Sequence, residues 1–315
     1  MASLRELSEK RGVRFGCAVS VEALDDPEYV EAVGRECGIS VAENASKFGP
    51  LCPSQGSHDY SAFDRIVAFA EERGMALRGH ALVWHTQTPK WLGEDLPVRE
   101  ILADHIEETV GRYRGRIESW DVVNEAVADD AGMRDTIFLR SLGPDYLEWA
   151  FRIAHEADPG CQLVYNDYSI DEVCPKSDRV YELLSDLLGK GVPVHGVGLQ
   201  AHLELSNPPN MDSVRRNVRR FRDLGLQVLV TEMDVRIPEP FSQEKREEQG
   251  RIYEEFVRAC VEEGVTRILT WGLTDRYSWI PGFFQGTGEA LPLDSKMRTK
   301  PAFEGLTRAL GESTG

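Results

Sequence analysis

The sequence predicts an α/β fold, a single (β/α)8 TIM barrel, and three observations support this prediction. Eight short β-rich runs recur along the 315 residues, and a segment of helical periodicity follows each of them. No linker, repeat or low-complexity stretch interrupts the alternation, so one domain over residues 1–315 is expected. The first run continues into SVEALDD, whereas an open doubly wound sheet would normally carry a glycine-rich phosphate loop at that point.

The strands are expected at the eight runs, which are residues 13–19, 38–42, 75–84, 117–124, 162–167, 194–201, 226–232 and 267–272. Helices are expected at residues 27–36, 59–73, 97–113, 144–157, 175–189, 212–224, 242–263 and 299–311. In the helix at 59–73, for example, Phe63, Ile66 and Ala70 recur at helical spacing on one face. Almost continuously apolar strands that alternate with helices are typical of parallel βα units.

Charge and hydropathy exclude several classes of partner. The chain has 36 Lys and Arg against 53 Asp and Glu, a net charge of −17, which would repel a phosphate backbone. The densest basic stretch, residues 215–220, lies beside Asp212 and Asp223, so no nucleic-acid partner is expected. No apolar run approaches the roughly 18 residues of a membrane span, so no membrane partner is expected either.

The amino-terminal residues and the cysteines bear on where the protein works. Residues 1–14 form a charged amphipathic stretch without a signal-peptide core, so we expect a cytoplasmic protein, or a secreted one whose leader has been removed. The six cysteines include no CxxC pair and no zinc-type spacing with histidine, so we expect reduced thiols. Separately, we expect the protein to be a monomer.

In (β/α)8 barrels the functional side chains lie at the carboxyl ends of the strands. Here two carboxylates stand out, because each ends an apolar strand: Glu125 in WDVVNEA and Glu232 in VLVTEMD. A glutamate at a strand end can simply cap the next helix, but two of them, at the fourth and seventh strands, suit glycoside hydrolysis. That reaction needs one acid to protonate the leaving oxygen and a second carboxylate to attack the sugar or activate water.

Other polar and aromatic residues at the predicted strand ends fit the same chemistry. Asn124 precedes Glu125 and can bond a sugar hydroxyl beside the reacting carbon, while His202 held by Asp234 can orient Glu232 and keep it ionised. Tryptophans stack on the C–H faces of sugars, although Trp120 and Trp149 are expected in the core. The remaining strand-end residues are Glu43, Asn44, Lys47, His80, Trp84, His85, Gln87, Asn166, Asp167, Gln200 and Trp271.

The chain resembles glycoside hydrolase family 10, the retaining endo-β-1,4-xylanases, over essentially its whole length. The resemblance rests on ENASK at 43–47, GHALVWHTQTP at 79–89, WDVVNEA at 120–126, YNDYS at 165–169, GLQAHL at 198–203, VTEMDV at 230–235 and WGLTDRYSW at 271–279. It implies hydrolysis of internal β-1,4-xylosidic bonds of xylan and xylo-oligosaccharides by double displacement, with no metal or cofactor.

The resemblance also implies residue roles. Glu125 would be the acid/base and Glu232 the nucleophile, with His202 and Asp234 supporting Glu232. The substrate-binding residues would be Lys47, His80, Trp84 and Asn124 around the cleaved sugar, Glu43, Asn44, Gln87, Trp271 and Trp279 on the glycone side, and also Gln200 and His202. Trp279 would disfavour a hydroxymethyl group.

The sequence departs from the family pattern at several positions. Phe48 stands where a Trp is usual, Ser169 replaces the last Asn of NDYN, and Cys260 lacks the cysteine that pairs with it in many secreted members. Residues 280–298 fit the pattern loosely.

Three alternatives remain at this point. The barrel could be a β-glucanase, or a non-catalytic xylan-binding protein. It could also be a metal-dependent hydrolase that uses His80, His85, His202 and Asp234, although the spacing of His80 and His85 tends to turn them apart.

Overall fold

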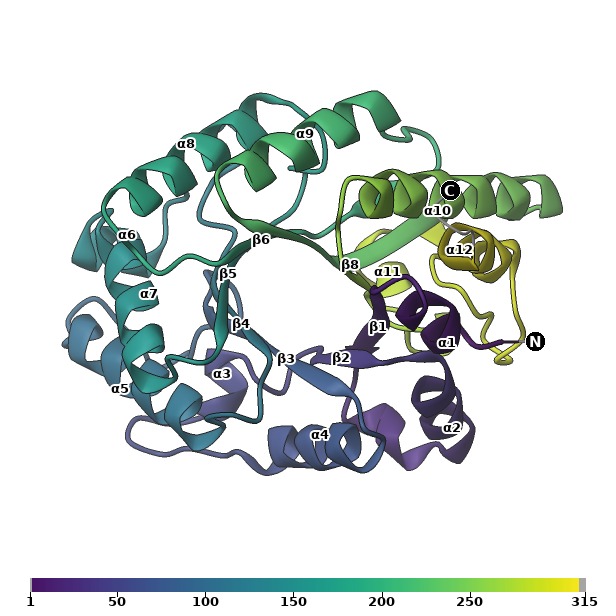
Figure 1. The fold of residues 1–315 in the computed structure, drawn as a ribbon. Coiled ribbons are helices and arrows are strands. Elements are labelled where there is room, and N and C mark those ends of the chain that lie inside the picture. The colour runs from purple at the N-terminus through teal and green to yellow at the C-terminus, as the bar shows by residue number, and fades with distance from the viewer. Residues whose placement is uncertain (1, 312–315) are drawn as a thin grey trace.

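The structure, a computed structural model, describes residues 2–311 and confirms the predicted (β/α)8 barrel (Figure 1). Every neighbouring pair of barrel strands is parallel, and β9 pairs with both β8 and β1, which closes the ring. The barrel strands are β1 Arg14–Val19, β2 Ile39–Ala42, β3 Ala76–Val83, β4 Ser119–Asn124, β5 Gln162–Asp167, β6 Gly196–Leu199, β8 Gln227–Pro238 and β9 Arg267–Thr270.

The main helices surround the ring of strands and agree with the predicted segments to within two residues at each end. They are α2 Pro27–Glu36, α4 Ser61–Glu72, α5 Val98–Arg112, α7 Tyr146–Ala157, α8 Pro175–Gly189, α9 Met211–Asp223, α10 Gln243–Glu262 and α12 Pro301–Gly311. Helix α2 illustrates why the boundaries are readable: the Asp26 side chain accepts from the N–H groups of Glu28 and Tyr29, and Pro27 occupies the first turn.

The structure also contains short elements that the sequence did not predict, because one or two helical turns, or two or three strand residues, give little periodicity. They are α1 Leu4–Glu9, α3 Phe48–Leu51, α6 Ile137–Leu142 and α11 Ile280–Phe283, the 3-10 turns η1 Glu22–Asp25 and η2 Asp275–Tyr277, and the strands β7 His202–Glu204 and β10 Thr287–Gly288. Helix α1 did carry a signal, since Ser3 and Glu6 form a reciprocal capping box.

The predicted bounds of the sixth and seventh strands are wrong at their carboxyl ends. Strand β6 stops at Leu199, because Ala201 takes a left-handed backbone with φ 57°. Strand β8 continues past Glu232 to Pro238, because beyond the barrel it pairs with β7, where His202 lies opposite Asp234, and with β10. Beyond the barrel, β7, β8 and β10 therefore form one small sheet. It contains His202 and Asp234, the two residues predicted to support Glu232.

The core has two layers. The larger layer lies between the strands and the helices, and it includes Trp120, which packs so closely on Gly79 that any added Cβ would overlap the indole. Trp149 is only partly buried against this layer, beneath the Arg99 guanidinium. A smaller apolar cluster of Ala18, Ile39, Val41, Leu269 and Trp271 fills part of the barrel interior.

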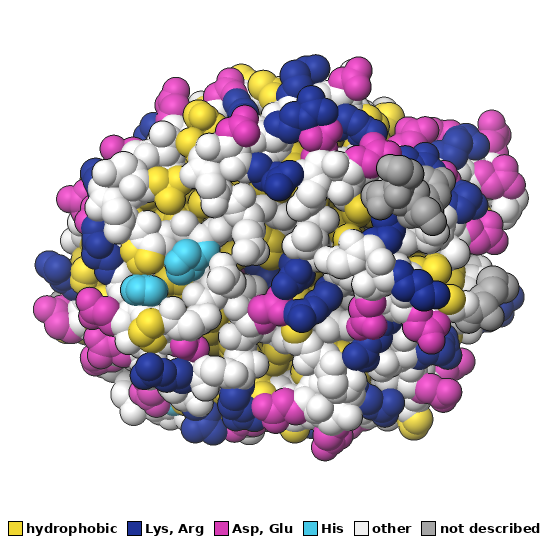
Figure 2. Space-filling view, in the orientation of Figure 1, with side chains coloured by type: hydrophobic (Ala, Val, Ile, Leu, Met, Phe, Trp, Pro, Cys, Tyr) yellow, Lys and Arg dark blue, Asp and Glu magenta, His cyan; other side chains and the backbone are white. Residues whose placement is uncertain are grey.

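Three further observations concern the helices, the surface charge and the cysteines of the described residues. Over residues 2–311 no helix combines the length and apolar character needed to cross a bilayer. On the face shown in Figure 2, basic and acidic side chains are interspersed. All six cysteines are free thiols, and the buried Cys17 and Cys37 lie with their Sγ atoms 3.6 Å apart.

Candidate active site

The two predicted catalytic carboxylates lie at the carboxyl end of the barrel and are both buried. Glu125 directly follows β4 with a left-handed φ of 57°, and its N–H donates to the carbonyl of Asn166 at 2.9 Å. Glu232 lies within β8, where the strand leaves the barrel. The exposed fractions are 8% for Glu125 and 4% for Glu232, so each carboxylate depends on protein donors rather than on bulk water.

Glu232 is surrounded by donors and by positive charge. Its Oε1 accepts from Asn166 Nδ2 at 2.7 Å, and its Oε2 lies 3.2 Å from Nε2 of His202. Burial alone would raise the pKa of Glu232, but the nearby imidazoles of His80 and His202 and the bond from Asn166 more than offset burial and lower the pKa to about 2. Glu232 is therefore a carboxylate across the ordinary pH range.

His202 lies between two carboxylates. Its Nδ1 is 3.0 Å from Asp234 Oδ2, and its Nε2 faces Glu232. Burial acts to lower the pKa of His202, but Asp234 and Glu232 together raise it to about 10, so the ring is an imidazolium that donates from both nitrogens. Trp279 Nε1 donates to the same Asp234 oxygen at 2.9 Å, which fixes this group further.

Glu125 has a different environment, made of amides and a neutral imidazole. Its Oε1 accepts from Asn124 Nδ2 and from Gln200 Nε2, each at 3.1 Å. Its Oε2 lies 3.8 Å from His85 Nδ1. Burial lowers the pKa of His85 despite the neighbouring carboxylate, so at neutral pH this imidazole adds no positive charge.

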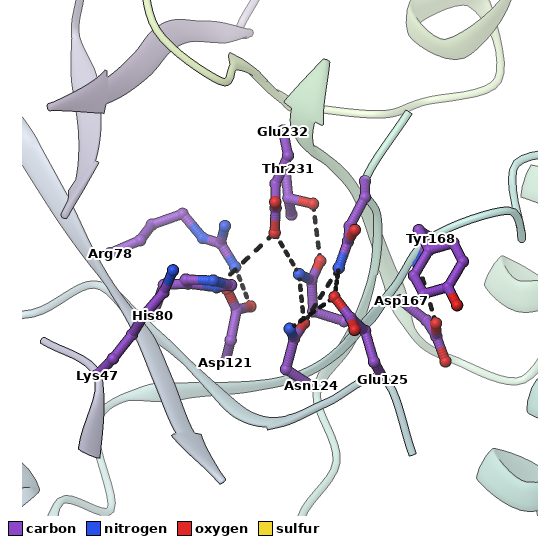
Figure 3. A network of polar contacts seen from close by, with 12 residues as sticks. Lys47, Arg78, His80, Asp121, Asn124, Glu125, Asp167, Tyr168, Thr231 and Glu232 are labelled. Carbon is purple, nitrogen blue, oxygen red and sulfur yellow. Dashed lines mark hydrogen bonds and ion pairs between the residues drawn. The ribbon is translucent and has the colours of Figure 1, made fainter. Parts of the chain in front are cut away.

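An amide network joins the two carboxylates (Figure 3). Asn166 Nδ2 donates both to Glu232 and, at 2.9 Å, to Asn124 Oδ1, which also accepts from Gln200 Nε2 at 3.2 Å. Thr231 Oγ1 donates to Asn166 Oδ1 at 2.7 Å and fixes the orientation of that amide. The carboxylates are thus held in one rigid polar layer contributed by β4, β5, β6 and β8.

A second polar group lies beside this layer. Lys47 Nζ donates to Asn44 Oδ1 at 2.8 Å, Gln87 Nε2 donates to the same oxygen at 2.9 Å, and Asn44 Nδ2 donates to Glu43. The Lys47 ammonium lies 4.6 Å from the ring centre of Trp84 and 5.8 Å from that of Trp271. Burial lowers the pKa of Lys47 to about 8, although Glu232 and Glu43 raise it.

Aromatic rings surround the two histidines. His80 lies 5.1 Å from Trp271 and 6.2 Å from Trp84, measured between ring centres, and His202 lies 5.1 Å from Trp279. The predicted site residues therefore converge in one region built from five or more strand ends. Indole faces beside carboxylates and amides suit a ligand that has both hydroxyl groups and C–H faces.

Sequence reasoning assigned no role to several residues that prove central. The sequence predicted Asn166 only as a strand-end residue, and His85 only as a strand-end residue that a metal-dependent enzyme could use as a ligand. Beneath His80 lies a fully buried ion pair of Arg78 and Asp121, and Asp121 Oδ2 is 2.9 Å from His80 Nδ1. The alternation of side chains along β3 and β4 was the available signal, since Arg78, His80 and Asp121 all occupy inward positions.

The departures from the family pattern lie in different environments. Phe48 is buried and stacks on His105, with ring centres 3.8 Å apart. Ser169 is exposed with φ 53°, and Cys260 is a buried free thiol.

The proposed metal ligands are used otherwise. His80 and His85 face different carboxylates, and both ring nitrogens of His202 face Asp234 and Glu232. Among residues 2–311 no group of three or more His, Cys, Asp or Glu is arranged to hold a metal ion. The donor set of the described site is that of a polar, carboxylate-centred pocket.

Comparisons with known proteins agree with this geometry. The model for glycosyl hydrolase family 10 matches residues 3–309. Endo-1,4-beta-xylanase B of Thermotoga neapolitana is 38% identical over 98% of this chain and 92% of its own length. Endo-1,4-beta-xylanase B of Paenibacillus barcinonensis is 40% identical over 86% of each chain. The crystal structure of xylanase 10B from Thermotoga petrophila RKU-1 in complex with xylobiose has a TM-score of 0.95 at 41% identity, covering 98% of this chain and 97% of that one.

Proposed function

This chain belongs to glycosyl hydrolase family 10 and is a glycoside hydrolase, and we propose that it is a retaining endo-1,4-β-xylanase. The substrates would be xylan and xylo-oligosaccharides. One observation carries the assignment of roles: the carboxylates of the two buried glutamates have different hydrogen-bond partners. Glu232 faces the His202 imidazolium and stays ionised, whereas Glu125 faces amides and an uncharged His85.

In the first step, Glu232 would attack the anomeric carbon while the bond to the leaving oxygen breaks and Glu125 gives its proton to that oxygen. The amides of Asn166 and Asn124 hold the two carboxylates in one polar layer, which suits an attack and a proton transfer at the same glycosidic bond. The products of this step are the shortened chain and a glycosyl ester on Glu232.

In the second step, Glu125 has already given up its proton, so it can accept a proton from water. The water oxygen attacks the anomeric carbon from the side that the leaving group occupied, and Glu232 departs as a carboxylate. Two inversions at one carbon give net retention. The imidazolium of His202 stabilises the departing carboxylate, as it does in the free enzyme.

The substrate-binding roles that the resemblance implies form part of the proposal. Lys47, His80, Trp84 and Asn124 would surround the cleaved sugar, and Glu43, Asn44, Gln87, Trp271 and Trp279 would line the glycone side. Gln200 and His202 would also contact the substrate. The fixed position of Trp279, through its bond to Asp234, supports a steric preference for xylose over a sugar with a hydroxymethyl group. The chemistry requires no cofactor or metal. The family match over residues 3–309 supports one catalytic domain, and we propose that the protein is a monomer.

Proton NMR of the earliest product tests the proposal. Internal cleavage with retention should release a mixture of xylo-oligosaccharides whose new reducing end is first the β-anomer. Early α-anomer would mean inversion, and faster release of sugar from carboxymethyl cellulose than from xylan would favour a β-glucanase. No release from any β-glycan would favour a binding protein, and loss of activity with a chelator would favour the metal-dependent alternative.

A further inference from the structure

The short connection between β6 and β7 contains a backbone kink that nothing in the proposed mechanism uses. Ala201 has φ 57°, a left-handed conformation that a side chain with a Cβ disfavours, and it is fully buried. Its neighbours, Gln200 and His202, flank the kink on either side. A buried non-glycine residue keeps such a conformation only where surrounding contacts hold it.

The kink separates two side chains that serve different carboxylates. Gln200 Nε2 donates to Glu125 Oε1 at 3.1 Å, whereas His202 Nε2 lies 3.2 Å from Glu232 Oε2. In a regular strand, residues two apart point to the same face. The backbone conformation of Ala201 therefore sets, at the same time, the direction of a donor to the acid/base and a donor to the nucleophile.

Three hydrogen bonds hold the kink in place. The N–H of Ala201 donates to Oδ1 of Asp171 at 3.0 Å, and its carbonyl accepts from the N–H of Asp234 at 3.2 Å. The N–H of Gln200 donates to the carbonyl of Asp167 at 3.1 Å. Only the first of these bonds uses a side chain. A substitution of Asp171 can therefore remove it without removing a hydrogen bond between two backbone groups.

Asp171 is itself buried, with an exposed fraction of 7%, on the loop that follows β5. Burial raises its pKa to about 6, while the His202 imidazolium and the Ala201 N–H lower it. The other titratable groups around it are Glu172 beside it and the Cys260 thiol on α10. Asp171 forms no hydrogen bond or ion pair with Glu125 or Glu232, so it can act on the reaction only through the Ala201 backbone or through its charge beside His202.

We propose that Asp171 is a positioning residue that locks the Ala201 kink and thereby aims Gln200 at the acid/base and His202 at the nucleophile. The inference rests on the proposed function for the roles of Glu125 and Glu232. Asp171 acts on the geometry of the carboxylates and not on the sugar, so its removal should affect turnover far more than substrate binding.

Kinetics of Asp171→Ala on xylo-oligosaccharides test this inference. We expect kcat to fall by about 10- to 100-fold, as small misplacements of catalytic groups do, with KM within about threefold of the wild type. Asp171→Asn keeps an oxygen acceptor at the same place and should recover most of kcat. Asp171→Ser, which offers a shorter acceptor, should be intermediate and provides a measurement if the alanine variant does not fold.

A matched control is Asp158, a buried acceptor at the opposite end of the barrel. It is 5% exposed and accepts from the N–H groups of Gly115 at 2.9 Å and Gly160 at 3.1 Å. Asp158→Ala should lower the melting temperature as Asp171→Ala does, yet leave kcat unchanged. An equal loss of kcat in both variants would reduce the role of Asp171 to general stability and overturn the inference.

A double-mutant cycle supplies the second readout. In the proposal Asp171 acts partly by aiming Gln200. The fold-loss of kcat in the double variant Asp171→Ala, Gln200→Ala should therefore be smaller than the product of the two single fold-losses. Wild-type kcat in Asp171→Ala, or fully multiplicative losses, would contradict the inference. Failure of the wild-type protein to cleave xylan would instead contradict the proposed function, and the two outcomes are separated by assaying the wild type alongside.

Discussion

At the carboxyl end of the barrel, buried carboxylates face amides and imidazoles, whereas at the amino end an accessible carboxylate faces guanidinium groups. Glu118, at the start of β4, forms ion pairs with Arg14 and Arg267, and its side chain is 25% exposed. Glu118 and Arg267 line a cavity of about 390 Å³, which Asp158 and His195 also line. Glu232 at the other end is 4% exposed and has a strongly lowered pKa.

The backbone conformation of the connecting segments also differs between the two ends of the barrel. Within residues 2–311, every non-glycine residue with a left-handed φ lies in a segment that follows a strand at the carboxyl end: Gln87, Glu125, Ala131, Ser169, Ala201, Glu289 and Met297. Turns at the amino end use glycines such as Gly115, Gly191 and Gly264 for the same conformation. Conformational strain and desolvated charge therefore occur together where the chemistry is proposed, and relaxed turns and screened charges occur where only the fold must be maintained.

The largest expected effect is that of Glu232→Ala. Removing the carboxylate takes away the nucleophile, so hydrolysis should fall to background on every substrate, including those with activated leaving groups. Circular dichroism should show an intact fold, because the strand remains paired on both sides. Residual turnover of xylan above that of a protein-free control would contradict the assignment.

Glu125→Ala should separate acid from base assistance. Cleavage of xylan should slow by about 10²- to 10⁴-fold, because its leaving oxygen needs a proton. A dinitrophenyl xylobioside needs no such help, so its release should show a burst followed by a slow steady rate as the glycosyl ester accumulates. Azide should restore the steady rate and give the β-glycosyl azide, and an equal loss on both substrates without azide rescue would reassign the two carboxylates.

His202→Gln should sharpen the electrostatic contrast, because it removes a positive charge but keeps a hydrogen-bond donor. The pKa of Glu232 is about 2 against an ordinary value of 4.5, so the carboxylate and the stability it contributes are present above pH 4.5 and are lost as the pH falls through about 2. Without the imidazolium that pKa rises, and the acid limb of kcat/KM should move to higher pH. His80 and Lys47 remain as positive or donor groups near Glu232, so the shift should be partial. An unmoved acid limb would show that His202 does not keep Glu232 ionised.

The smallest expected effect is at the amino end. Glu118→Gln breaks the pairs with Arg14 and Arg267, but accessible ion pairs contribute only about 0.2–1 kcal/mol each, so the loss of stability should be small. The value of kcat should be unchanged. Added salt should narrow the difference in unfolding free energy between variant and wild type, and a fall in kcat would show that the two ends of the barrel are coupled.

The sequence by itself determined the alternation of strands and helices, because apolar periodicity and capping residues such as Asp26 and Pro27 are local signals. It also predicted that Glu125, Glu232, His202 and Asp234 lie at the carboxyl rim of the barrel, since a polar residue directly after an apolar run marks the point where a strand leaves the barrel, although β8 itself continues to Pro238. In parallel barrels all strand ends of one polarity meet at one face, so convergence of these residues followed from the fold class.

Only the tertiary structure decided how those residues are set against one another. The bridging role of Asn166, the approach of His85 to Glu125 and the Arg78–Asp121 pair beneath His80 depend on which inward positions become neighbours across strands. The extension of β8 to Pro238 and the left-handed Ala201 held by Asp171 depend on pairing partners that are distant in the chain. Local propensity would have continued β6 and ended β8 at the barrel rim. It was overruled because, in the kinked and extended arrangement, the buried N–H groups of Ala201 and Asp234 donate to the Asp171 side chain and to the Ala201 carbonyl.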